Sequence, residues 1–215
     1  MGKDKLRKFA ELDTFKNVYQ LKQGLDLKNN WGKQHFKNSN PIVLELACGK
    51  GEYTVNLAQL FPNKNFIGVD LKGNRIWRGA RTATDENIGN VAFLRIQIED
   101  VLDYFGAGEI DEIWITFPDP QPQLSREKKR LTAPGFLNKY KIILKEGGAV
   151  NLKTDNDQLY EFTKYVIEEM KLHLQVDTSD LYNSEYADEV LSIKTYYEKK
   201  YLIHSKNINY LKFTF

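Results

Sequence analysis

The feature that most constrains the fold is a regular alternation of short apolar runs and helical segments after residue 40. The apolar runs are Ile42–Leu46, Asn65–Val69, Val91–Ile96, Glu112–Thr116 and Ala149–Leu152, with a last run at 208–215. The predicted helices are Glu52–Leu60, Gly73–Glu86, a short one near Val101–Phe105, Pro134–Leu144 ending at Gly147-Gly148, and one that begins near Asp155. Strands separated by helices are typical of a parallel, doubly wound α/β sheet with helices on both faces.

The first forty residues have a different character. They are polar, rich in Lys and Asn, and show no clear strand pattern. The cluster Asn38-Ser39-Asn40-Pro41 is a typical breaker of regular structure. We therefore predict a basic N-terminal extension over residues 1–40 and one main domain over residues 41–215.

Charge is unevenly distributed, although the formal net charge is only +2. Residues 1–40 hold nine Lys or Arg against four acids, and residues 125–145 hold seven against Glu127 alone. Such segments indicate one basic face, the kind of surface that binds a polyanion. The alternative is that they are ordinary solvated helix faces.

Several classes of site are disfavoured by composition. Cys48 is the single cysteine, so a disulfide framework or thiolate cluster is excluded, and the three histidines lack metal-ligand spacing. No apolar run reaches the roughly 18 residues of a membrane span, and the charged N-terminus does not resemble a signal peptide. We expect a cytoplasmic protein with no metal and no membrane contact.

A glycine-containing turn follows the first run of the main domain. Gly49 and Gly51 stand where open α/β sheets bind nucleotides, but Thr54 replaces the third glycine of a dinucleotide fingerprint. Glu45 lies inside an apolar strand, which is costly unless the acid is hydrogen-bonded or faces a cationic ligand. An acid there favours S-adenosylmethionine, which carries an amine and a sulfonium, over NAD. Asp70 is placed to accept from ribose hydroxyls.

Gln97 and Glu99 end the next strand, where polar side chains can reach an adenine edge. A second turn, Phe117-Pro118-Asp119-Pro120, follows another strand and precedes a basic cluster. Two prolines make this turn stiff, so we expect it to present a buried carboxylate for chemistry. The alternative is a solvated turn. Asp155, after a further strand, is either a helix N-cap or a second carboxylate for substrate.

Together these motifs resemble the bacterial tRNA (guanine-N7)-methyltransferases over about residues 40–215. The matching segments are Glu45 with Gly49-Lys50-Gly51, Asp70, Phe117-Pro118-Asp119-Pro120, Lys128-Lys129-Arg130-Leu131, Lys153-Thr154-Asp155 and Thr195-Tyr196-Tyr197-Glu198. The resemblance implies a class I methyltransferase sheet of about seven strands and S-adenosylmethionine as donor. The implied acceptor is a guanosine of the tRNA variable loop, position 46 in tRNA numbering.

The resemblance also implies roles for individual residues. It assigns cofactor binding to Glu45, Gly49, Gly51, Asp70, Gln97, Glu99 and Asp119, with Asp119 as the catalytic acid. It assigns substrate binding to Gln123, Asp155, Thr195, Tyr196, Tyr197 and Glu198, and RNA binding to Ser125, Arg126, Glu127, Lys128, Lys129 and Arg130. The chain departs from the family pattern at Ala47, Gln121, Gln123, Leu124 and Ser125, where the family usually has Gly, Trp, Lys and basic or His residues.

Two other readings remain open at this stage. A methyltransferase of the same fold could act on a small molecule or a protein, which the basic segment 125–145 argues against. A non-catalytic RNA-binding protein could retain the fold, which the three carboxylates Glu45, Asp70 and Asp119 argue against. The protein is expected to act as a monomer or a homodimer.

Overall fold

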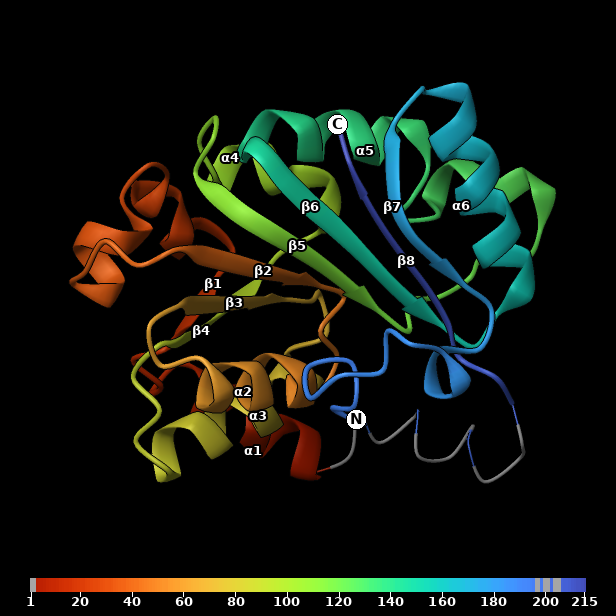
Figure 1. Ribbon diagram of the computed structural model, residues 1–215. Helices are drawn as coiled ribbons and strands as arrows, with labels where there is room; N and C mark the ends of the chain where they lie inside the picture. Colours follow the sequence, from red (N-terminus) through yellow and green to blue (C-terminus); the bar gives the residue numbers. More distant parts are fainter. Residues whose placement is uncertain (1–2, 196–197, 199–201, 203–205) are drawn as a thin grey trace.

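The computed structural model describes residues 3–195, 198, 202 and 206–215. Within them, eight strands form one twisted sheet in the order β1-β4-β3-β2-β5-β6-β8-β7 (Figure 1). The strands are β1 Val18–Gln20, β2 Ile42–Leu46, β3 Asn65–Val69, β4 Val91–Arg95, β5 Ile110–Thr116, β6 Leu144–Thr154, β7 His173–Thr178 and β8 Asn209–Thr214. β1 to β6 pair in parallel, whereas β8 runs antiparallel to both of its neighbours.

Helices cover both faces of this sheet. They are α1 Lys3–Leu12, α2 Glu52–Leu60, α3 Gly73–Asp85, α4 Val101–Tyr104, α5 Pro134–Ile143 and α6 Asp157–Glu169. α1, α2 and α3 lie below the sheet in the view of Figure 1, and α4, α5 and α6 lie on its other side. Successive strand residues point to opposite faces, so Leu44 and Leu46 join the core under α5 while Val43 joins the core under α2. The prediction of a doubly wound α/β sheet is confirmed.

The N-terminal forty residues contain more regular structure than the sequence pattern indicated. The expectation of no clear strand there is wrong, because Val18–Gln20 forms β1 and pairs with β4. The side chains of Leu12, Trp31 and Phe36 are buried in the two cores. β1 is only three residues long, which is too short for an alternation of apolar and polar residues to be recognised in the sequence. The division of the chain at residue 40 stays a prediction.

The last third of the chain also corrects several expectations. α5 ends at Ile143, and Gly147 and Gly148 lie within β6, where the register against β5 is irregular. β7 was not predicted; it is one of the eight strands of the sheet. The N-cap of α6 is Asn156, whose side chain accepts from the Leu159 amide. Among the helices described, none is long and apolar enough to cross a membrane.

Candidate active site

The turn between β2 and α2 is shaped by backbone that glycine adopts readily. Gly49 and Gly51 have φ of 57° and 70°, and Ala47 has φ of 59°. A Cβ on Gly51 would lie 2.5 Å from the ring of Phe93, so this glycine is also required by close packing. The Gly51 amide donates to the Cys48 carbonyl at 2.8 Å, which closes the turn. At Gly49 and Gly51 the turn therefore exposes backbone with no Cβ at the carboxyl end of β2.

Glu45 lies directly beneath this turn and is 2% exposed. One carboxylate oxygen accepts from the Thr54 amide at 2.8 Å and from the Thr54 hydroxyl, and the other accepts from the Thr116 hydroxyl at 2.5 Å. Burial raises the pKa of Glu45 to about 7, although these hydrogen bonds act in the opposite direction. Thr54 therefore does here what a third glycine could not, since its hydroxyl satisfies a buried acid.

Asp70, at the end of β3, holds the same turn from the other side. Its carboxylate accepts from the Gly49 amide at 3.0 Å and from the Lys72 amide at 2.7 Å. The side chain is almost fully buried, at 8% exposure of the residue. Asp70 thus joins the glycine turn to the start of α3 while lining a hollow at the strand ends.

Two hollows meet at Ala47, at the carboxyl ends of the parallel strands. The larger, about 230 Å³, is lined by Ala47, Asp70, Leu71, Ile96, Gln97, Ile98, Glu99, Lys129, Leu131 and Phe136. The smaller, about 60 Å³, is lined by Ala47, Cys48, Gly49, Lys50, Glu52, Arg75, Thr116, Phe117 and Thr195. The larger combines apolar walls with polar ends, which suits a nucleoside, and the smaller is about equally polar and apolar. The structure thus places Gly49 and Thr195 on the smaller hollow and Asp70, Gln97 and Glu99 on the larger one.

The turn that carries Asp119 is stiff, but its carboxylate is not buried. Phe117 and Gln121 have φ of 49° and 45°, and the Phe117 amide donates to the Lys153 carbonyl at 2.9 Å. Asp119 accepts from the Gln121 amide at 3.1 Å and is exposed. The expectation of a buried carboxylate is therefore wrong, because this local bond turns the side chain outward. Asp119 lines neither hollow.

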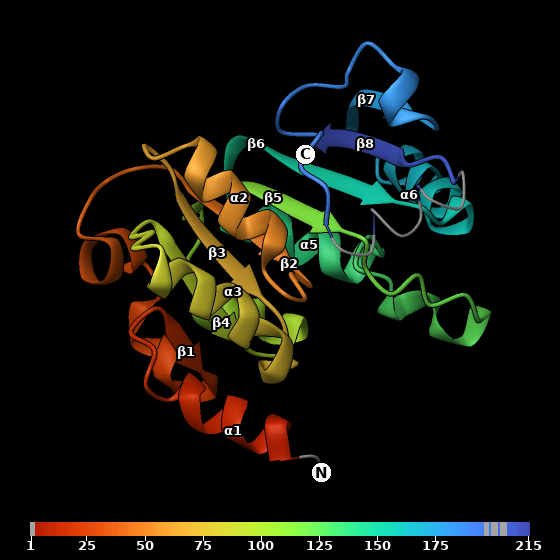
Figure 2. The ribbon, with the colours of Figure 1, turned by 90° about the horizontal axis from the view of Figure 1, so that it is seen from below.

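The basic segment after this turn is a 3₁₀ helix, Leu124–Lys129, that projects from the body of the protein (Figure 2). Gln123, Ser125, Arg126, Lys128 and Lys129 are exposed, whereas Glu127 is partly buried. Arg130 differs from its neighbours because it is 2% exposed and lies over the ring of Phe162 at 4.3 Å. Its Nε donates to the Gln121 carbonyl at 3.3 Å. Arg130 therefore braces the Asp119 turn from inside.

A buried ion pair fastens the segment that includes Thr195. Lys153 Nζ lies 3.0 Å from the Glu198 carboxylate, and both side chains are fully buried. The same ammonium donates to the carbonyls of Leu191 at 2.7 Å and Ile193 at 3.3 Å, and Tyr182 donates to Glu198. Burial lowers the pKa of Lys153, and the adjacent carboxylate opposes that shift. Glu198 is thus placed inside the protein; Tyr196 and Tyr197 lie outside the described residues.

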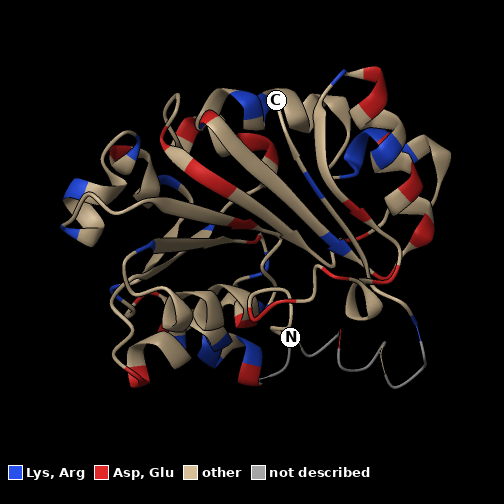
Figure 3. Cartoon of the chain, in the orientation of Figure 1, with Lys and Arg blue, Asp and Glu red and all other residues tan. Residues whose placement is uncertain are grey.

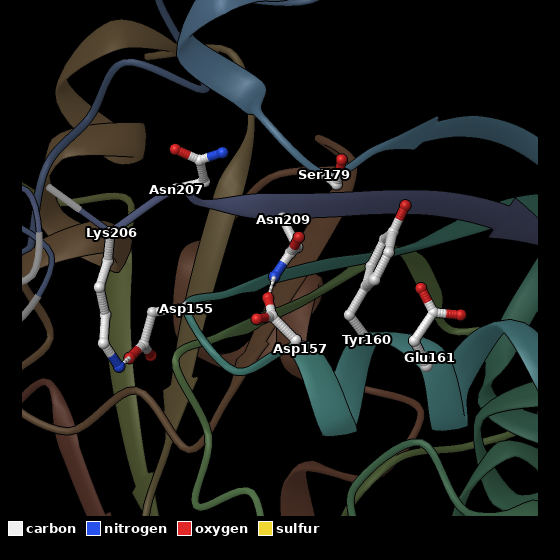
Figure 4. Close-up of a pocket in the computed structure, with 8 residues that line it drawn as sticks. All are labelled: Asp155, Asp157, Tyr160, Glu161, Ser179, Lys206, Asn207 and Asn209. Atoms are coloured by element: carbon white, nitrogen blue, oxygen red, sulfur yellow. Dashed lines mark hydrogen bonds and ion pairs between the residues drawn. The ribbon is translucent and has the colours of Figure 1, made fainter.

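Asp155 belongs to a separate hollow of about 500 Å³ (Figure 4). Its lining residues are Asp155, Asp157, Tyr160, Glu161, Ser179, Lys206, Asn207 and Asn209. Lys206 Nζ lies 3.2 Å from the Asp155 carboxylate. The structure does not bring Asp155 into either hollow beside Ala47. In the described part of the chain, no cluster of three or more His, Cys, Asp or Glu side chains could hold a metal ion.

Residues to which the sequence pattern assigned no role also shape the site. Thr116 satisfies Glu45, Arg75 lines the smaller hollow, and Lys153 and Tyr182 hold Glu198. Thr116 is the last residue of β5, directly before the Asp119 turn. A polar residue at the end of an apolar strand is a signal that could have identified it from the sequence. The pairing of Lys153 with Glu198 has no local signal.

Comparison with known proteins identifies relatives over nearly the whole chain. A family model described as "Putative methyltransferase" matches residues 39–211. The tRNA (guanine-N(7)-)-methyltransferase of Christiangramia forsetii is 47% identical, over 99% of this chain and 98% of that protein. The enzyme of that name from Bacteroides thetaiotaomicron is 46% identical, over 99% of this chain and 86% of that protein.

Solved structures share the fold at low sequence identity. The 16S rRNA methyltransferase KamB has a TM-score of 0.63 and 15% identity, over 85% of this chain and 91% of that one. A 16S rRNA (adenine(1408)-N(1))-methyltransferase from Catenulisporales acidiphilia, solved with its cosubstrate S-adenosylmethionine, has a TM-score of 0.57 and 13% identity, over 86% of this chain and 90% of that one. These structures show the fold alone; the relatives at 46–47% identity and the family model place the chain in the bacterial tRNA (guanine-N7-)-methyltransferase family.

Proposed function

We propose that this protein transfers the methyl group of S-adenosylmethionine to N7 of a guanosine in the variable loop of tRNA. The observation that carries the proposal is the pair of hollows that meet at Ala47, between Asp70 and the Phe117 turn. The relatives named above support the acceptor and the target atom. Because its substrate would be tRNA, we expect the protein to work in the cytoplasm.

The lining of the two hollows supports S-adenosylmethionine as the donor. Asp70 would accept from the ribose hydroxyls, and Gln97 or Glu99 would meet the adenine edge between Ile96, Ile98 and Phe136. Glu45, which is buried and has no cationic partner among the described residues, would attract the positive charges of the ligand across the glycine turn. When bound, the donor supplies a methyl group on a cationic sulfur.

The chemistry needs little from the protein beyond positioning. Guanine N7 already carries a lone pair, so no base has to remove a proton before attack. As N7 gains the methyl group, positive charge develops on the purine. A carboxylate that accepts from the N1–H and N2–H edge would stabilise that charge. We assign this role to Asp119, which is exposed on a stiff turn, in preference to Asp155, which is paired with Lys206.

The first experiment combines purified protein, labelled S-adenosylmethionine and unmodified tRNA with nucleoside analysis of the product. We expect label in 7-methylguanosine. In the Asp119→Asn variant, turnover should fall by about 10²-fold or more, because a neutral amide cannot balance the purine charge. The exposed Asp103→Asn variant in α4 is the matched control. Wild-type turnover in Asp119→Asn, with unchanged cofactor affinity, would remove this role from Asp119.

The same assay separates the alternatives. If methyl transfer survives RNase treatment of the acceptor, the substrate is not RNA. If the protein binds S-adenosylmethionine but transfers nothing to tRNA, a different acceptor is favoured. If it binds tRNA but no cofactor, it is a non-catalytic RNA-binding protein.

A further inference from the structure

α1 and α3 pack side by side below the sheet and carry a concentrated positive charge (Figures 1 and 3). Segments 3–12 and 72–85 hold eight Lys or Arg against three acids, an excess larger than the net charge of the whole chain. Trp77 lies at the contact between the helices, with Arg7 and Lys8 over its ring and its indole N–H donating to Glu11. The helices therefore form one continuous surface.

The three acids of this surface are already paired. Asp4 lies 2.9 Å from Arg7 and 2.8 Å from Lys8, and Glu11 lies 2.7 Å from Arg7. Asp85 lies 2.8 Å from Arg81. A second set of cations, for which the described part of the chain provides no acidic partner, consists of Lys5, Lys72, Arg75 and Arg78. We call these four residues the α1–α3 basic surface.

The α1–α3 basic surface reaches the proposed active site. Arg75 lines the smaller hollow beside Gly49, and Lys72 follows two residues after Asp70. Arg75 and Arg78 are three residues apart on α3, so they lie on the same side of the helix. The larger hollow is lined by Lys129 of the basic segment Leu124–Lys129. Cations thus border the joined hollows at both ends, and the two basic regions lie on different sides of the strand ends (Figure 2).

We propose that the α1–α3 basic surface binds the phosphate backbone of the substrate RNA, opposite the segment Leu124–Lys129. This inference rests on the proposed function, because it takes tRNA as the polyanion. Lys72, the residue directly before α3, and Arg78 on α3 are exposed and line neither hollow, an arrangement that suits separate phosphates of a polyanion better than one small anion. Two contact regions on either side of the hollows would hold the RNA while one base enters them.

The test uses the double variant Lys72→Gln/Arg78→Gln and measures tRNA binding by fluorescence anisotropy over a salt series. Each lost phosphate contact should reduce the slope of log K against log salt by nearly 1, so we expect a reduction of about 2 in all. We also expect the Kd for tRNA at about 0.1 M salt to rise roughly tenfold. The KM for S-adenosylmethionine should stay unchanged.

The control is Lys171→Gln/Lys212→Gln, which removes one exposed and one half-buried cation outside both basic segments of the sequence and outside α1 and α3. If the test variant keeps the wild-type Kd and salt slope, as the control should, the inference is wrong. If wild-type protein binds tRNA in a manner that depends on Lys72 and Arg78 but does not methylate it, the proposed function fails and the surface stands. If wild-type protein methylates tRNA and the variant binds normally, only the surface fails. If wild-type protein does not bind tRNA, both fail.

Discussion

Two fully buried glutamates near the strand ends are satisfied in opposite ways. Glu45 accepts from an amide and two hydroxyls and has no cation among its hydrogen-bond partners. Glu198 lies 3.0 Å from the Lys153 ammonium and also accepts from Tyr182 and from the Thr195 amide at 3.2 Å. The hydrogen bonds to Glu45 do not offset the loss of hydration on burial, and so the pKa of Glu45 is raised to about 7.

The difference separates a binding position from a structural clamp. A buried acid with no cation of its own keeps its attraction for a cationic ligand, which matches the donor proposed above. A buried acid beside a lysine is already neutralised by the protein and has little attraction left for a ligand. The Glu198 pair joins β6 to the segment 191–198, and through the Lys153 carbonyl it reaches the Phe117 amide. Measuring how each acid contributes to the free energy of unfolding therefore tests whether the Glu198 pair is structural and whether Glu45 is buried without a compensating charge.

The largest effect is expected from Lys153→Met. Removing the cation leaves the Glu198 carboxylate buried without a counter-charge, which typically costs about 3–5 kcal/mol in the free energy of unfolding. Denaturant unfolding measures this loss. The double variant Lys153→Met/Glu198→Leu should recover most of it, because no charge is then buried. If the single and double variants are equally unstable, packing and not charge is what the pair contributes.

How much of this arrangement the sequence predicts depends on how local its causes are. β2, α2 and β3 have the bounds that were predicted, because each is an apolar or periodic run between turn residues. The cluster of Gly49, Asp70, Gln97 and Glu99 follows from the topology, since the carboxyl ends of parallel strands share one edge. All four residues line the two hollows, Gly49 the smaller one and the other three the larger one.

What could not be predicted arises from contacts between distant residues. Lys153 and Glu198 meet only after the chain has crossed the sheet, so neither position has a local signal for burial. The outward orientation of Asp119 depends on left-handed backbone at Phe117 and Gln121. Neither residue type favours that conformation, so the sequence gives no sign of it. Arg130 follows exposed cations in sequence but packs inward on Phe162.

A smaller effect is expected from the titration of Glu45. Its pKa is raised in the folded state from 4.5 to about 7, so folding favours the protonated acid. The stabilisation is complete below pH 4.5 and is lost as the pH rises to about 7, by roughly 3 kcal/mol. The free energy of unfolding measured between pH 4 and pH 8 reports it, with Glu45→Gln as the reference. A difference between the two proteins that does not change with pH would contradict the raised pKa.

The smallest effect is expected from Lys206→Met, which breaks an ion pair of nearly the same length in a different environment. Lys206 lies 3.2 Å from Asp155, but the lysine side chain is 54% exposed, whereas both partners of the Lys153 pair are fully buried. Water screens the exposed charges, so the loss should stay below about 1 kcal/mol. Unfolding of Lys206→Met and Lys153→Met under the same conditions compares the two pairs directly. Equal losses would mean that distance, and not burial, sets the contribution of each pair, and the distinction between the clamp and an ordinary surface contact would then disappear.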